Sequence, residues 1–226
     1  MFGFGKRVKV VAVDVIGTLF PLEPLRPAVV ALGLPPGALE TWFAAALRDA
    51  FALACVNDFQ PFAGVLQAAL MQTLAERNLP PPTDDGKSLI ARLETLRPRP
   101  DAAVAFDTLL SRGVRVMALT NGSRASTRAM LKNAGLDGMV ERIVSVDDVG
   151  LSKPRRQVYR RAAKKAGVKP ARMCLIAAHP WDINGAKASG LKAAYLSADT
   201  PYPSTMRAPD FAAPGLSELA QAIIEG

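Results

Sequence analysis

The segment that most constrains the fold is a short apolar run near the start of the chain, VKVVAV over residues 8–13, which is followed by Asp14. The run is rich in β-branched residues and too short for a typical helix. Its near-continuous apolar character is typical of a strand buried on both faces of a parallel sheet. In open α/β sheets, reactive groups gather at the carboxyl ends of such strands, where Asp14 stands. An aspartate before a Gly-Thr turn is equally compatible with a turn residue, so its assignment depends on later segments.

Two blocks of different patterning follow this strand. Prolines and the Gly33–Gly37 segment interrupt the chain after Phe20, and helical patterns without a strand-like run then continue to about residue 98. The helices expected in this block are Ala38–Cys55, Phe62–Arg77 and Asp85–Leu96.

From Asp101 onward, helical and strand patterns alternate, which predicts a parallel sheet with helices on both faces. The strands expected here are Val114–Leu119, Arg142–Val146, Met173–Ala178 and Lys192–Leu196. The fold class predicted is therefore α/β, with a doubly wound core. Residues 1–20 and 99–226 would form this core, and residues 21–98 would form a helical cap inserted after the first strand.

The composition narrows the class of partner. The 28 Lys and Arg residues exceed the 20 Asp and Glu residues and give a net charge of +8. They are spread along the chain, so the charge favours attraction of a small anionic molecule over nucleic-acid binding. Cys55 and Cys174 lack metal-type spacing, which favours a reducing, cytoplasmic setting. No signal-peptide pattern or membrane-spanning stretch is present in the sequence, so no membrane partner is expected.

Polar residues follow three later strands at the points where those strands end. They are Thr120-Asn121, then Lys153 after a strand and loop, then His179 and Asp182 in the last loop. Each of these residues also has a simpler, purely structural interpretation. Thr120-Asn121 fits a strand-ending turn, Lys153 a surface residue at a helix start, His179 a structural histidine, and Asp182 a carboxylate favoured by a helix N-terminus.

Together with Asp14-x-x-Gly17-Thr18, these segments resemble, in order and spacing, the haloacid dehalogenase superfamily over nearly the whole chain. Within the superfamily the chain is most similar to the type II L-2-haloacid dehalogenases. The motifs that carry this closer resemblance are Gly17-Thr18-Leu19-Phe20, Trp42, Thr120-Asn121-Gly122-Ser123, Ser145-Val146-Asp147, Lys153-Pro154, Val158-Tyr159, Trp181-Asp182 and Gly185-Ala186.

The resemblance implies catalytic roles for residues of these motifs. Asp14 would be the nucleophile, and Thr18 would bind the substrate while hydrogen-bonding near Asp14. Lys153 would balance the charge of Asp14, whereas His179 and Asp182 would sit beside the hydrolytic water. A carboxylate is ionised at neutral pH, so Asp14 needs no base to act as a nucleophile. It does need a nearby cation to stay ionised when water is excluded.

The resemblance also implies substrate contacts. Thr120 and Asn121 would hold the substrate carboxylate or the halide, and Tyr159 would line the pocket, although a helical tyrosine is as readily core filler. The predicted reaction is hydrolytic dehalogenation of a short 2-haloacid through an aspartyl ester, without a cofactor. A homodimer through the apolar cap helices is expected by analogy alone.

The alternative enzyme reading is a Mg²⁺-dependent phosphatase of the same superfamily. Such relatives carry a second Asp two residues after the nucleophile, which protonates the leaving group. Ile16 stands at that position, and Ala178 stands where an acidic residue would help to bind the metal. Only Asp14 and Asp182 would remain as Mg²⁺ ligands. Because a halide leaves without a proton, Ile16 favours dehalogenation.

The chain also departs from the dehalogenase pattern. That family places an arginine just after the cap tryptophan to help remove the halide, and Phe43 stands there. Arg48 lies about 140° further around the helix, and Arg26 is the other candidate. Ile16 replaces a usual aromatic residue, and Ala177 and His179 replace a serine and an asparagine near the water. The alternative hypothesis outside the enzymes is therefore a catalytically idle relative that binds a small anion or a protein.

Overall fold

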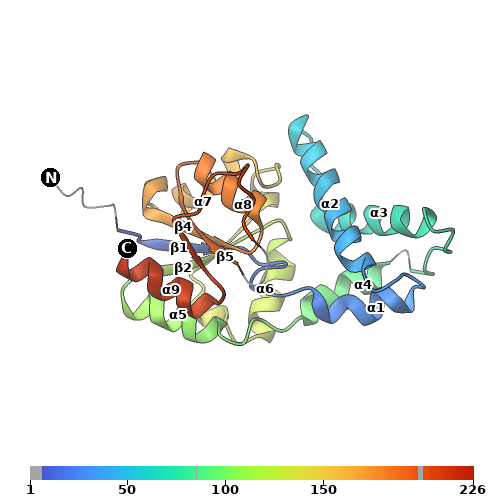
Figure 1. Ribbon diagram of the computed structural model, residues 1–226, viewed down its shortest axis with the longest axis horizontal. Helices are drawn as coiled ribbons and strands as arrows, with labels where there is room; N and C mark the ends of the chain where they lie inside the picture. The colour runs from blue at the N-terminus through green and yellow to red at the C-terminus, as the bar shows by residue number, and fades with distance from the viewer. Residues whose placement is uncertain (1–6, 85, 198–200) are drawn as a thin grey trace.

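The structure is a computed structural model that describes residues 7–84, 86–197 and 201–226. The chain forms an α/β part and a helical part that lie side by side (Figure 1). The N-terminal residues 1–6 that we assigned to the core, and Asp85, where a helix was expected to begin, lie outside the described residues.

Within the described residues, six parallel strands form one sheet in the order β3-β2-β1-β4-β5-β6. Their bounds are β1 Val10–Val13, β2 Arg115–Thr120, β3 Arg142–Ser145, β4 Met173–Ala177, β5 Lys192–Leu196 and β6 Phe211–Ala213. The chain winds outward from β1 in both directions, so the carboxyl end of β1 lies at a topological switch point. The predicted doubly wound α/β fold is confirmed.

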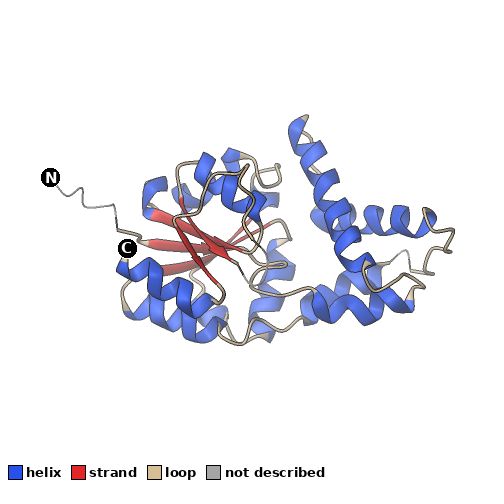
Figure 2. Ribbon diagram, in the orientation of Figure 1, coloured by secondary structure: helices blue, strands red, loops and turns tan. Residues whose placement is uncertain are grey.

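Helices cover both faces of this sheet (Figure 2). They are α5 Ala102–Ser111, α6 Arg124–Asn133, α7 Arg156–Lys165, α8 Pro180–Ala188 and α9 Leu216–Glu225. Side chains alternate along a strand, so Val11 and Val13 of β1 belong to the core cluster that includes α5, α6 and α9. Val10 and Ala12 belong to the cluster that includes α7 and α8. This two-sided burial is why the strand that precedes Asp14 is apolar throughout.

The helical part is built around the long helix α2. Its helices are α1 Arg26–Ala31, α2 Ala38–Cys55, α3 Phe62–Ala75 and α4 Lys87–Ala91, followed by the 3-10 turn η2 Arg92–Thr95. Trp42 on α2 is buried, and its Nε1 donates a hydrogen bond to the carbonyl oxygen of Leu66 on α3 at 2.8 Å. None of the helices described here combines the length and apolarity needed to cross a membrane.

Four further 3-10 turns complete the described elements. They are η1 Glu23–Leu25, η3 Asp137–Met139, η4 Val146–Asp148 and η5 Pro170–Arg172.

The chain passes twice between the two parts, and one residue joins the passages. The backbone N–H of Arg99 donates to the carbonyl oxygen of Leu19 at 2.9 Å, and its Nε donates to that of Thr18 at 2.8 Å. Arg99 lies between Pro98 and Pro100, whose fixed φ angles stiffen this passage. The loop that follows β1 is thereby anchored to the return of the chain from the helical part.

Candidate active site

Asp14 follows β1 directly and is only 5% exposed. Its Oδ1 accepts a hydrogen bond from Nζ of Lys153 at 2.9 Å, and its Oδ2 accepts one from Oγ1 of Thr18 at 2.6 Å. The backbone N–H of Asp14 donates to Ile176 on the neighbouring strand β4 at 2.9 Å. The carboxylate is therefore fixed in position, with a cation at one oxygen and a hydroxyl donor at the other.

The turn after Asp14 depends on Gly17 and Thr18. Gly17 has a φ of +82°, a left-handed conformation that L side chains rarely adopt. Thr18 accepts a hydrogen bond from the backbone N–H of Ala178 at 2.9 Å, so its hydroxyl proton is left to point at Asp14. The loops after β1 and β4 are thus joined through this one hydroxyl group.

Lys153 is fully buried between two carboxylates. Besides Asp14, its Nζ donates to Oδ2 of Asp182 at 2.8 Å. Its backbone N–H donates to Oδ1 of Asn121 at 3.1 Å, which ties the lysine loop to the loop after β2. The simpler reading of Lys153 as a surface lysine is wrong, because the structure places it at the centre of the cluster.

Asp182 lies in the first turn of α8 and is fully buried. Its Oδ1 accepts a hydrogen bond from the hydroxyl group of Tyr159 on α7 at 2.6 Å. The two helices can approach this closely because position 185 is a glycine, where a Cβ atom would lie 2.5 Å from the Tyr159 oxygen. Tyr159 therefore holds Asp182 in place through the oxygen that Lys153 does not contact.

Burial and charge shift the pKa values of this cluster. Burial alone lowers the pKa of Lys153, but the attraction of Asp14 and Asp182 outweighs it, so the net shift is upward. Burial, reinforced by the charge of Asp14, raises the pKa of Asp182 against the stabilising effect of Lys153. Burial and the charge of Asp182 hold the pKa of Tyr159 well above its ordinary value of 10. One ammonium group thus serves two carboxylates, which gives Asp182 a tendency to take up a proton.

His179 stands over Asp14 on the side of the helical part. Its Nε2 lies 3.9 Å from Oδ2 of Asp14 and 3.3 Å from the carbonyl oxygen of Ile16. The imidazole ring stacks on Trp181, with ring centroids 5.5 Å apart and an interplanar angle of 11°, and it contacts Phe43 at 5.8 Å. The histidine is therefore held between two aromatic rings at the edge of the buried cluster.

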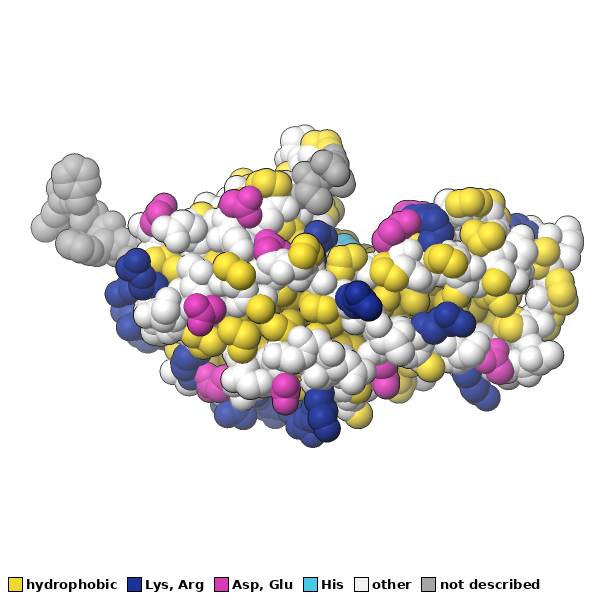
Figure 3. Space-filling view, turned by 90° about the horizontal axis from the view of Figure 1, so that it is seen from below, with side chains coloured by type: hydrophobic (Ala, Val, Ile, Leu, Met, Phe, Trp, Pro, Cys, Tyr) yellow, Lys and Arg dark blue, Asp and Glu magenta, His cyan; other side chains and the backbone are white. Residues whose placement is uncertain are grey.

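The surface is hollowed between the two parts (Figure 3). Two pockets are lined by residues of the loop after β1 together with residues of the helical part. One has a volume of about 310 Å³ and is lined by Gly17, Pro21, Leu22, Glu23, Leu39, Glu40, Phe43, Ala44, Leu47 and His179. The other has a volume of about 190 Å³, and its lining includes Ile16, Phe62, Leu66, Gly122, Ser123 and Asp147. Both draw residues from the helical part and the α/β part, so a molecule bound in either would contact both.

The loop after β2 contributes Thr120 and Asn121. Thr120 is fully buried, and its Oγ1 accepts a hydrogen bond from the backbone N–H of Gly122 at 2.9 Å, which shapes the turn. Asn121 is 7% exposed and contacts the lysine loop, as described above. The structure thus brings seven predicted site residues into one connected group, with Thr120 beside it. The seven are Asp14, Thr18, Asn121, Lys153, Tyr159, His179 and Asp182.

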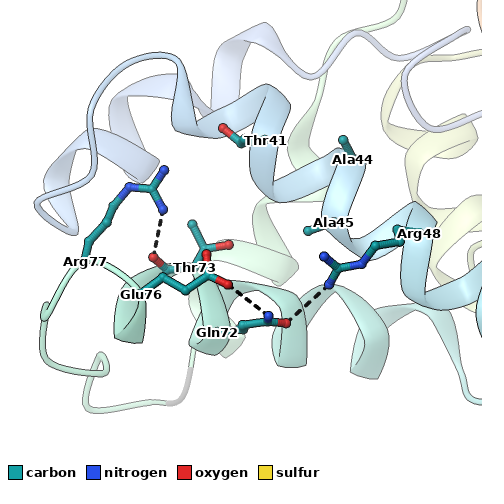
Figure 4. Close-up of a pocket in the computed structure, with 8 residues that line it drawn as sticks. All are labelled: Thr41, Ala44, Ala45, Arg48, Gln72, Thr73, Glu76 and Arg77. Atoms are coloured by element: carbon teal, nitrogen blue, oxygen red, sulfur yellow. Dashed lines mark hydrogen bonds between the residues drawn. The ribbon is translucent and has the colours of Figure 1, made fainter.

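Neither arginine considered as a replacement at position 43 points at Asp14. Nε of Arg48 donates to Asp49 at 2.8 Å, and its Nη2 reaches Gln72 of α3 at 3.4 Å, in the groove between α2 and α3 (Figure 4). Arg26 forms ion pairs with Glu23 and Glu40, which line a pocket with His179, and not with Asp14. Phe43 therefore leaves that position apolar.

The described residues fit a Mg²⁺ site poorly. No group of three or more His, Cys, Asp or Glu side chains in the described ranges is arranged to hold a metal ion. Asp14 and Asp182, the two ligands suggested by sequence, already share the ammonium group of Lys153. Mg²⁺ requires near-octahedral oxygen coordination, which these two side chains alone do not provide.

Two residues with positional importance had no predicted role. Gly185 permits the contact between Tyr159 and Asp182, and Arg99 fixes the backbone of Thr18. Gly185 was visible only as part of a motif, three residues after Asp182. Arg99 was visible only as a basic residue between two prolines, and its contact spans 81 residues of sequence.

Comparisons with known proteins agree with this architecture. Over 223 residues the chain is 25% identical to haloacetate dehalogenase H-2 of Moraxella sp. strain B, covering 96% of this chain and 99% of the relative. It is 27% identical to the (S)-2-haloacid dehalogenase of Xanthobacter autotrophicus, covering 96% and 95%.

Solved structures of L-2-haloacid dehalogenase from Xanthobacter autotrophicus share the fold. The TM-score is 0.88 for one structure and 0.86 for a second with chloropropionic acid covalently bound, each 24% identical and covering 96% of this chain and 98% of that one. The family model of haloacid dehalogenase-like hydrolases matches residues 8–190, most of the chain. The chain therefore belongs to the haloacid dehalogenase-like hydrolase family.

Proposed function

We propose that the protein hydrolyses the carbon–halogen bond of a 2-haloacid through a covalent ester at Asp14. The observation that carries the proposal is the buried carboxylate of Asp14, held by Lys153 at 2.9 Å and Thr18 at 2.6 Å, in a loop whose Ile16 and Gly17 line the two pockets. A carboxylate that is ionised, desolvated and fixed in orientation is prepared for attack on carbon. The Moraxella and Xanthobacter relatives, both named as dehalogenases, support the same chemistry.

In the first step, an oxygen of Asp14 attacks the carbon that bears the halogen. A new C–O bond forms as the C–halogen bond breaks, and the bonding electron pair leaves with the halide. The leaving halide needs no proton, which agrees with Ile16 in the position where a proton donor would otherwise stand. The ammonium group of Lys153, 2.9 Å from Oδ1 of Asp14, pairs with the carboxylate before the attack.

In the second step, water attacks the carbonyl carbon of the Asp14 ester. Its proton passes to a base, the bond between the acyl carbon and the ester oxygen breaks, and the departing oxygen takes the proton back from the base. A 2-hydroxyacid is released and the carboxylate is restored. Asp182, with its raised pKa, and His179, 3.9 Å from Asp14, are the proposed groups beside this water. General base catalysis of this kind contributes about 10²–10⁴-fold.

Thr120 and Asn121 are proposed to hold the substrate carboxylate or the halide, and Thr18 is proposed to lie beside the substrate while orienting Asp14. Because Oδ1 of Asn121 already accepts from Lys153, the donor end of its amide is the end available to an anion. For Tyr159, the bond to Asp182 supports a positioning role that acts through Asp182.

The proposal is tested by isotope labelling in a single turnover. Excess enzyme is mixed with 2-chloropropionate in H₂¹⁸O, and both the lactate and the peptide containing Asp14 are analysed by mass spectrometry. We expect ¹⁸O in the Asp14 carboxylate and ¹⁶O in the new hydroxyl group, because the product oxygen comes from Asp14. Label in the lactate alone would show direct attack of water on carbon. The variant Asp14→Asn should lose halide release while keeping the fold.

A parallel assay separates the alternatives. The enzyme is incubated with 2-chloropropionate and with a phosphate ester, each with and without Mg²⁺. Halide release without Mg²⁺ supports the dehalogenase, and Mg²⁺-dependent phosphate release supports the phosphatase. Failure of both over a broad substrate panel would favour a catalytically idle, anion-binding or protein-binding relative.

Several expectations about cellular context remain predictions. A cytoplasmic location, the absence of a cofactor and of a nucleic-acid partner, and a homodimer through the helical part follow from composition or resemblance. Fractionation, metal analysis and light scattering of the purified protein test them.

A further inference from the structure

We propose that the pocket of about 310 Å³ beside His179 receives the hydrocarbon chain of the substrate, so that 2-haloacids with chains longer than propionate are preferred. This inference rests on the proposed dehalogenase function and extends it to the substrate class. We call this cavity the tail pocket.

The tail pocket is apolar where a hydrocarbon chain would lie. Its walls include Pro21, Leu22, Leu39, Phe43 and Leu47. Two carboxylates, Glu23 and Glu40, also line it, and Arg26 forms ion pairs with both. The pocket therefore offers an apolar surface to a substrate tail, and its two rim carboxylates are both paired with Arg26, which leaves one negative charge in excess at the rim.

The inner end of the tail pocket adjoins the nucleophile. Gly17, three residues after Asp14, and His179 both line it, and Nε2 of His179 lies 3.9 Å from Oδ2 of Asp14. Phe43 contacts the His179 ring and forms the wall at this end. A substrate whose reacting carbon lies at Asp14 can extend its chain past the edge of His179 and along Phe43.

The volume exceeds what a three-carbon acid needs. A water molecule takes about 30 Å³ in the liquid, so 310 Å³ corresponds to about ten such volumes. It also lies at the lower end of the range of about 300–1,000 Å³ for small-molecule sites. The tail pocket can thus take several methylene groups.

The pocket of about 190 Å³ is a poorer place for this chain. It is smaller, and its lining includes Glu94 and Asp147, which, unlike Glu23 and Glu40, form no ion pair with another described residue. Burial raises the pKa of Asp147, which shows that this carboxylate is already partly desolvated. An apolar chain there would desolvate it further, so the tail pocket is favoured.

The test is a chain-length series of 2-bromo acids with three, four, six and eight carbons, scored by bromide release from the full-length enzyme. Transfer of a methylene group from water to an apolar site is worth up to about fourfold in binding. We expect kcat/KM to rise by up to about fourfold per added methylene, mainly through a lower KM, because the chain binds equally in ground and transition states.

Two variants assign the rise to the tail pocket. Ala44→Phe fills it from an exposed position on α2, and Leu22→Gln makes its half-buried wall polar. Both should flatten the chain-length dependence while leaving kcat/KM for 2-bromopropionate within about twofold. Ala52→Phe is the matched control, because Ala52 is an exposed alanine on the same helix outside this lining, and it should keep the wild-type dependence.

The outcomes separate this inference from the function on which it rests. Bromide release that is flat or falls with chain length would overturn the tail pocket and leave the dehalogenase proposal standing. A rise that persists in both Ala44→Phe and Leu22→Gln would place the chain elsewhere and also overturn it. Absence of bromide release from every acid, including 2-bromopropionate, would instead refute the proposed function.

Discussion

The hydroxyl group of Tyr159 lies 2.6 Å from Oδ1 of Asp182, and both side chains are fully buried. Tyr159→Phe leaves this carboxylate oxygen without its donor. A hydrogen bond to a charged group contributes about 1.5–3 kcal/mol, so we expect the free energy of unfolding in urea to fall by about that amount. Tyr202→Phe, which removes an exposed hydroxyl bonded to the carbonyl oxygen of Arg207, is the control and should cost less. Equal losses of unfolding free energy in the two variants would mean that the buried hydrogen bond contributes no more than the exposed one.

The same tyrosine predicts a pH dependence. Its folded pKa lies well above the value of about 10 in the unfolded chain. Above pH 10 the unfolded state therefore binds fewer protons than the folded state, and the free energy of unfolding falls as pH rises. One such group contributes up to about 1.4 kcal/mol per pH unit. The free energy of unfolding is measured in urea from pH 9 to pH 11.5 for the wild type and Tyr159→Phe. Its decrease per pH unit should be smaller in the variant by about this amount, whereas parallel curves would contradict the raised pKa of Tyr159.

Removing the ammonium group of Lys153 leaves two carboxylates buried without their cation. Because breaking a buried pair leaves an uncompensated charge, we expect Lys153→Met to lower the free energy of unfolding by about 3–5 kcal/mol and to stop halide release. Adding Asp182→Asn removes one of the two charges and should recover part of the stability without recovering activity. If the double variant were no more stable than the single one, charge would not be the cause.

Gly185 tests the close approach of α7 and α8. A Cβ atom there would lie 2.5 Å from the Tyr159 oxygen and 2.8 Å from Cβ of Pro154. Gly185→Ala should displace Tyr159, reduce the free energy of unfolding by about 1–3 kcal/mol and lower kcat. Gly64→Ala, in open space on α3, should instead stabilise by about 0.5–1 kcal/mol. A neutral Gly185→Ala would show that the helices can separate freely.

Gly17 combines backbone strain with a side-chain clash. Gly17→Ala would place Cβ 2.6 Å from Nε2 of His179, at a φ of +82°. We expect kcat/KM to fall on the order of 100-fold, because Asp14 and His179 would be misplaced by a fraction of an ångström to an ångström. Gly113→Ala has a similar φ of +73° but open space around it, so it should cost stability and keep kcat/KM. Equal loss of activity in both would assign the effect to backbone strain alone.

The sequence predicted the sheet well because its central strands are buried on both faces. The expected Lys192–Leu196 strand agrees with β5, and the apolar run before Asp14 became β1. β6 was not predicted, since its three residues carry too short a pattern, and α1 was hidden by the prolines around it. The helix expected over Asp85–Leu96 is shorter in the described residues, where α4 gives way to a 3-10 turn.

The site was predictable as a collection of residues but not as a set of contacts. Parallel strand ends meet at one edge, so Asp14, Lys153 and Asp182 could be expected to lie together. The stacking of His179 on Trp181 and the turn of Arg48 toward Gln72 could not be read from the chain. They depend on side-chain packing between elements, which periodicity does not encode.

The bonds from Arg99 to Leu19 and Thr18 have a mechanical consequence. Thr18 also donates its hydroxyl proton to Asp14. Arg99, where the chain returns from the helical part, is therefore connected to the nucleophile through Thr18 by two hydrogen bonds. A movement of the helical part that displaces Arg99 would also displace Thr18, and through Thr18 the carboxylate of Asp14. Displacement of Arg99 and reorientation of the nucleophile are therefore mechanically coupled.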